Sequence, residues 1–209
     1  MRPRRMLAVL LIGACTGALG DRATATAASA SPEAGERVFA NKRCNRCHAL
    51  HVEQGTGPTL DEIRRPQGAM ELAGRLWNHL PGMLAALART RSEWPQITVA
   101  EMADLMVFLQ ADTKRDSAPD LSRGHVTLVR KGCLKCHRFR REGGRIEPDL
   151  ATQRADYASP AAWAATMWTH TPRMAAMAER QGIPYPRFSG DEMGNLLAFL
   201  KSTAVTTSR

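Results

Sequence analysis

One five-residue pattern, Cys-x-x-Cys-His, occurs twice in the chain, at Cys44–His48 and at Cys133–His137. Two thiols at this spacing can bond to the two vinyl groups of one porphyrin, and the histidine beside them can give an axial nitrogen to its iron. A thioredoxin-like redox pair would need a βαβ setting that the sequence lacks, and a four-cysteine zinc site would leave both histidines without a role. The pattern therefore predicts two covalently bound haems c. Their thioether bonds would come from Cys44, Cys47, Cys133 and Cys136, and their axial nitrogens from His48 and His137.

The two motifs lie inside a longer repeated unit. A glycine stands nine residues before each motif, at Gly35 and Gly124. After each motif comes the pattern Trp-x-His-x-Pro-x-Met, at Trp77–Met83 and Trp168–Met174. A period of roughly 90 residues is longer than that of solenoid repeats, so the sequence indicates a duplicated domain.

Each copy is predicted to begin and to end with an amphipathic helix. Residues 35–43 and 124–132 lead into the motifs, and residues 101–109 and 192–200 carry apolar side chains at helical spacing. Thr98 and Ser189 precede the later helices and have an acidic residue three positions on, which is typical of a capping box. Neither copy shows the alternating pattern of a strand. Aromatic residues make up only 5% of the chain, so the haems would supply much of each core.

We therefore expect an all-α fold with two tandem helical domains, each wrapped around one haem. The polar, proline-containing stretch after the first terminal helix marks a linker. The predicted boundaries are a leader at 1–30, domains at 31–112 and 121–203, a linker at 113–120 and a tail at 204–209.

The first 30 residues are typical of an export signal. Arginines at positions 2, 4 and 5 precede an apolar run from Met6 to Ala14, which is too short to span a bilayer. Ala28–Ala30 offers a cleavage site, whereas Leu11–Cys15 resembles a bacterial lipobox. The protein is expected in the periplasm. Cys15 is either discarded with the leader or lipidated, and only lipidation would bring the protein to a membrane surface.

The net charge of +9 does not predict nucleic-acid binding. Without residues 1–30 the chain has 25 basic and 19 acidic residues, or +6. Two haems would add about four propionate charges and leave the folded protein nearly balanced. Basic residues cluster beside the second motif, where they form either a solvated face or a docking patch for an acidic redox partner. The cluster consists of Arg130, Lys131, Lys135, Arg138, Arg140, Arg141 and Arg145.

These motifs resemble the small class I cytochromes c, in tandem form and over essentially the whole chain after the leader. In that family a loop proline offers its carbonyl to the axial histidine, and a methionine that follows a proline-containing loop binds the iron. The resemblance implies that Pro58 and Pro148 orient the axial imidazoles and that Gly35 and Gly124 mark where the first and last helices cross. It gives the role of sixth ligand to Met83 and Met174. A histidine four residues before each methionine departs from the family pattern and leaves bis-histidine ligation open, with His79 and His170 as the alternative sixth ligands.

The resemblance also implies a function. We expect a periplasmic di-haem cytochrome c that carries single electrons between respiratory or dehydrogenase partners and is not itself an enzyme. The alternative is a di-haem, peroxidase-like enzyme or a haem subunit of a larger oxidoreductase complex. Both copies keep the same His-x-Pro-x-Met set, and no large insertion would build a substrate pocket, which favours the carrier. Trp77 and Trp168 are expected to wall the haem crevices.

Overall fold

The computed structural model describes residues 29–50, 55–152 and 154–204. Residues 1–28 of the predicted leader, with Cys15, and residues 205–209 of the predicted tail lie outside this part of the chain. Among the residues that the structure describes, no helix has the length and apolar character needed to cross a bilayer. Residues 31–112 and 121–203 are called here the N-terminal half and the C-terminal half.

The described chain is mostly helical, as predicted. The α-helices are α1 (Pro32–Asn41), α2 (Leu60–Ile63), α3 (Ala69–Thr90), α4 (Val99–Phe108), α5 (Leu121–Arg130), α6 (Pro160–Arg180) and α7 (Glu192–Thr203). Short 3-10 helices are η1 (Cys44–Arg46), η3 (Thr113–Arg115), η4 (Cys133–Lys135) and η5 (Ala155–Tyr157). Two small sheets were not predicted: β1 (Gln67–Gly68) pairs in parallel with β2 (Ala111–Asp112), and β3 (Arg138–Phe139) pairs antiparallel with β4 (Glu142–Gly143). Strands of two residues are too short to show an alternating pattern.

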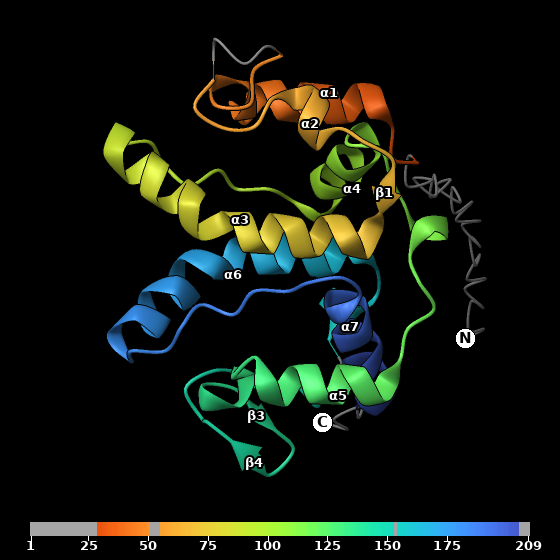
Figure 1. Ribbon diagram of the computed structural model, residues 1–209, viewed down its shortest axis with the longest axis vertical. Helices are drawn as coiled ribbons and strands as arrows, with labels where there is room; N and C mark the ends of the chain where they lie inside the picture. The colour runs from red at the N-terminus through yellow and green to blue at the C-terminus, as the bar shows by residue number, and fades with distance from the viewer. Residues whose placement is uncertain (1–28, 51–54, 153, 205–209) are drawn as a thin grey trace, which may run out of the picture.

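Helix α1 crosses α4, and α5 crosses α7 in the same way (Figure 1). Gly35 lies against the backbone carbonyl of Asp104 and leaves no room for a Cβ atom. Gly124 lies in the same manner against the carbonyl of Asn195. The crossing points implied by the family resemblance are therefore confirmed at both glycines.

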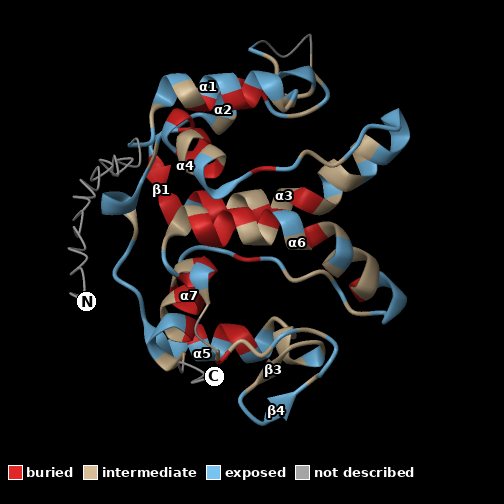
Figure 2. Ribbon diagram, turned by 180° about the vertical axis from the view of Figure 1, so that it is seen from behind, coloured by how far each residue is buried: buried red, intermediate tan, exposed pale blue. Residues whose placement is uncertain are grey.

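Helices α3 and α6 run side by side through the middle of the molecule, with α1 and α4 on one side and α5 and α7 on the other (Figure 1). Their buried residues face one another, whereas their C-terminal ends are more exposed (Figure 2). The buried apolar side chains of the two halves form one continuous cluster. Gly74 of α3 approaches the side chain of Met193 of α7, where a Cβ would lie 3.5 Å from that of Met193.

Two local details differ from the sequence prediction. The predicted linker, residues 113–120, contains η3 and is tied to the fold, because Asp116 Oδ1 accepts a hydrogen bond of 2.8 Å from Met70 N at the start of α3. Thr98 forms the complete capping box of α4. Ser189 makes only part of one: its backbone N–H donates to Glu192, but Gly190 adopts a positive φ of 52° and α7 begins later, at Glu192.

Candidate haem-binding site

Each Cys-x-x-Cys-His motif forms a tight 3-10 turn directly after a helix. Arg43 and Gly132 precede the turns in the left-handed region, with φ of 62° and 73°. The N–H of the motif histidine then donates to the carbonyl of the first cysteine over 2.9 Å in both halves. All four motif cysteines are free thiols, and burial raises the pKa of Cys44 and of Cys133 to about 11.

Both motif histidines are oriented by a proline carbonyl. His48 Nδ1 lies 2.9 Å from the carbonyl oxygen of Pro58, and His137 Nδ1 lies 3.0 Å from that of Pro148. A carbonyl accepts a hydrogen bond only from a protonated nitrogen, so the proton lies on Nδ1 and the Nε2 lone pair is free to bind a metal. The contact implied by the family resemblance is thus present in both halves.

A second histidine faces each motif histidine. The rings of His48 and His79 have centroids 5.4 Å apart, and those of His137 and His170 are 5.9 Å apart. Two imidazoles on opposite sides of one metal ion, each about 2 Å from it, have ring centres about 6 Å apart. Burial, and then the neighbouring motif histidine, lowers the pKa of both His79 and His170, which keeps these imidazoles neutral.

Helices α3 and α6 carry these facing histidines at the same place along their length. In each helix the histidine precedes an internal proline by two residues and a methionine by four, so the histidine and the methionine lie on one face, a turn apart. Met83 and Met174 are half-buried and pack against the core. The methionines therefore lie within long helices rather than in loops.

A cavity of about 390 Å³ lies in the C-terminal half, between α5, the motif, α6 and α7. Cys133, Cys136, His137 and His170 line it, together with Met174 and a largely apolar wall. The apolar lining includes Leu128, Pro148, Leu150, Trp163, Met167, Leu196 and Leu200. This donor set and lining fit a haem c: two thiols for the vinyl groups, two imidazoles for the iron and an apolar surround for the ring.

The described residues do not support a zinc site. No three His, Cys, Asp or Glu side chains gather as ligands within the described ranges. The two motifs lie at opposite ends of the molecule, one beside α1 and one beside α5 (Figure 1). The four cysteines therefore cannot coordinate one ion.

The two central tryptophans do not simply wall the crevice of their own half. Trp77, of α3, lines the cavity of the C-terminal half. Its Nε1 donates to the carbonyl of Pro186 over 2.6 Å, and its ring stacks on Tyr185 at 5.0 Å. Trp168, of α6, reciprocally donates to the carbonyl of Pro95 in the N-terminal half over 2.7 Å. The sequence showed the tryptophans in register but could not show that each reaches into the opposite half.

The internal proline of α3 explains one of these contacts between the halves. Pro81 has no N–H, so the carbonyl of Trp77, four residues earlier, is left without its helical partner. The hydroxyl of Tyr185 donates to that carbonyl over 3.3 Å. A contact between the halves thus satisfies a backbone group that the proline leaves free.

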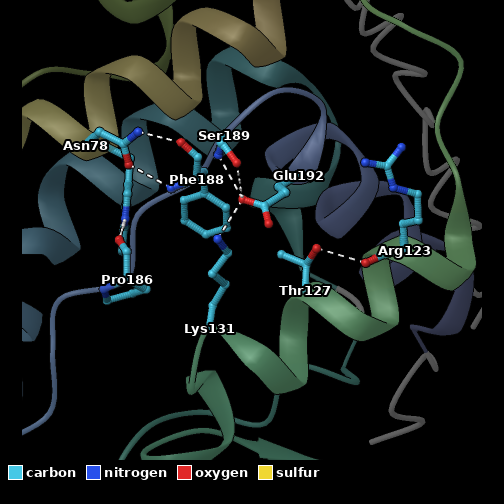
Figure 3. Close-up of polar contacts among 9 residues, drawn as sticks. Asn78, Arg123, Thr127, Lys131, Pro186, Phe188, Ser189 and Glu192 are labelled. Atoms are coloured by element: carbon cyan, nitrogen blue, oxygen red, sulfur yellow. Dashed lines mark hydrogen bonds and ion pairs between the residues drawn. The ribbon is translucent and has the colours of Figure 1, made fainter.

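Asn78 adds a second polar link between the halves, which sequence reasoning missed (Figure 3). Its Nδ2 donates to the carbonyl of Phe188 over 2.6 Å, and its Oδ1 accepts from the Phe188 N–H over 2.8 Å. The equivalent residue in the other half, Thr169, is exposed. Because the two copies differ here, the register of the repeat gave no signal.

Comparison with known proteins supports haem binding by the C-terminal half of the chain. Residues 122–204 match the family model of cytochrome c. No curated protein and no solved structure gave a significant match to the chain. The matched segment contains the second motif and the facing pair His137 and His170. The match supports a c-type cytochrome, an electron-transfer protein that binds iron in haem c.

Proposed function

We propose that the protein is a di-haem cytochrome c that carries single electrons, with one haem in each half. The observation that carries this proposal is the repetition of one arrangement in both halves: a motif histidine held by a proline carbonyl, beside a second, half-buried imidazole whose Nε2 is buried. The N-terminal half lies outside the family match, so its haem rests on this geometry and on its motif. The predicted tandem domains, at 31–112 and 121–203, belong to the same proposal.

The residues of each half have separate tasks in electron transfer. When bound, a haem c supplies an iron that cycles between its ferrous and ferric states. The motif thiols fix the ring covalently, and the proline carbonyl fixes the tautomer and direction of the axial imidazole. The apolar wall of the C-terminal cavity would exclude water, so few dipoles would have to reorient when the charge changes. Nothing in this arrangement requires a substrate bond to break.

The basic hairpin beside the second motif is the proposed docking surface for an acidic redox partner. Lys131 is paired with Glu192 and Arg138 with Asp149, so these two side chains are engaged within the fold. The others are exposed, on and around β3 and β4: Arg130, Lys135, Arg140, Arg141 and Arg145. Exposed positive charges attract a partner of opposite charge and so increase the association rate, most strongly at low salt.

We also propose that the chain is exported to the periplasm, on the strength of its leader. Mass spectrometry of the mature N-terminus would test this. A start near residue 31 indicates simple cleavage, a lipidated Cys15 indicates an anchor, and an intact Met1 contradicts export.

The haem number can be measured on protein from a host that matures c-type cytochromes. We expect the pyridine haemochrome assay and the intact mass to give two covalent haems. Cys44→Ala with Cys47→Ala, and separately Cys133→Ala with Cys136→Ala, should each leave one. A wild type with a single haem, held only by the second motif, would contradict the di-haem proposal.

A further inference from the structure

We propose that the sixth iron ligands are His79 and His170, and that Met83 and Met174 are apolar packing residues beside them. This inference rests on the proposed function, because it assumes a haem in each half. It also departs from the family pattern, in which methionine takes this position.

The first argument is the direction of the rings. Pro58 occupies Nδ1 of His48, so the free Nε2 of this imidazole points away from the proline loop. The ring of His79 lies beside that of His48, with the two centroids 5.4 Å apart. His137 and His170 repeat the arrangement at 5.9 Å. Both separations are close to the value of about 6 Å that two imidazoles on one metal ion require.

The second argument is the absence of any other partner for these imidazoles. His79 Nε2 and His170 Nε2 are buried side-chain atoms that make no hydrogen bond within the described part of the chain. A buried polar atom without a partner costs about 1–3 kcal/mol. That two such atoms recur at equivalent positions, each facing an oriented motif histidine, indicates a ligand between the rings. A metal–nitrogen bond would satisfy both.

The third argument concerns the methionines. Met83 and Met174 lie one turn further along α3 and α6 than the histidines, at the i+4 position. A thioether is a weak acceptor and can be buried without a partner at little cost. Packing against the core therefore accounts fully for both methionines, whereas it leaves both histidines unexplained.

The test is the spectrum of the holoprotein with histidine and methionine variants of matched position. The variants are His79→Ala, His170→Ala, Met83→Leu and Met174→Leu, since leucine keeps the volume of methionine without its sulfur. We expect the oxidised wild type to be low-spin and to lack the sulfur-to-iron band near roughly 700 nm. Both Met→Leu variants should keep this spectrum. Each His→Ala variant should turn one of the two haems high-spin, and added imidazole should restore the low-spin form.

The outcomes separate this inference from the proposed function. Two covalent haems with a sulfur-to-iron band that Met83→Leu and Met174→Leu remove in turn would overturn histidine ligation and leave the di-haem carrier intact. Fewer than two covalent haems in the wild type would overturn the di-haem proposal first. If a His→Ala variant fails to incorporate haem, the Met→Leu variants still decide, because they retain all four histidines.

Discussion

Single glycines set how closely the outer helices approach. Gly35 touches the backbone of Asp104, and Gly124 touches that of Asn195. A backbone carbonyl inside a helix cannot move aside as a side chain can. The two glycines are therefore needed because they have no side chain. The free-energy cost of replacing either one is set by overlap of the new Cβ with the backbone rather than by helix propensity.

We predict that Gly35→Ala lowers the free energy of unfolding by about 3 kcal/mol, because overpacking against the Asp104 carbonyl outweighs the better helix propensity of alanine. Gly82 is the control, since it is exposed within α3 and nothing lies within 4 Å of an added Cβ. Gly82→Ala should be stabilising by about 0.5–1 kcal/mol. Denaturant unfolding of both holoproteins measures the difference, and equal midpoints would contradict the packing argument.

Residue-level reasoning from the sequence predicted the motifs, the proline carbonyls and the two crossing glycines. The motifs follow from their local spacing, whereas the proline carbonyls and the crossing glycines were implied by the family resemblance, and both sets of residues recur in both copies. The same reasoning ranked the methionines above the histidines as ligands, since a sequence does not show which of two residues on one helix face has an unpaired buried atom. The ring pairs and the missing partners are the observations on which the proposal of histidine ligation rests.

At the scale of elements, α3 and α6 each serve both halves. Helix α3 presents His79 to His48 in its own half and Trp77 to the cavity of the other. These two residues are two positions apart, which places them on opposite sides of a helix. No periodicity in one helix reveals which neighbour each side will contact, so the exchange between the halves could not be predicted from the sequence.

The Asn78 contact allows a test of this exchange. We expect Asn78→Ala to lower the free energy of unfolding by about 2 kcal/mol, because the N–H and carbonyl of Phe188 lose their partners in a part-buried place. Thr169→Ala, at the equivalent exposed position, should change it by less than about 0.5 kcal/mol. Similar effects of the two substitutions would show that Asn78 does not link the halves.

An ion pair joins the end of α1 to the start of α4. The Lys42 ammonium lies 2.8 Å from Glu101 and, by its hydrogen bond, lowers the pKa of that carboxyl. The unfolded chain then binds more protons than the folded one between the two pKa values, so this contribution is present above about pH 4.5 and is lost as the pH falls further. The wild type should lose free energy of unfolding as the pH falls from neutral to acid. We predict that Glu101→Gln makes this loss smaller, by less than about 1 kcal/mol. A pH profile of Glu101→Gln identical to that of the wild type would contradict a contribution from this ion pair.

For the whole molecule, the haems are expected to be part of the core. The C-terminal cavity is apolar and lies between the three longest elements of its half. We predict that protein produced without haem attachment loses most of its helical circular dichroism and binds hydrophobic dyes, because an empty apolar cavity does not offset the entropy of ordering the chain. A haem-free protein that unfolds cooperatively near the temperature of the holoprotein would contradict this.

The shared wall formed by α3 has a consequence for how the protein matures. A haem bound beside His48, as proposed, would fix His79 and order α3, and the same helix brings Trp77 to the cavity of the C-terminal half. A haem in the C-terminal half would then enter a site whose wall is already in place, so part of its ordering cost would have been met. Linkage requires the reverse to hold equally. In the wild type, half-loaded chains should accordingly be scarce during biogenesis, and the variants that lack one attachment motif should accumulate at a lower yield with their single haem.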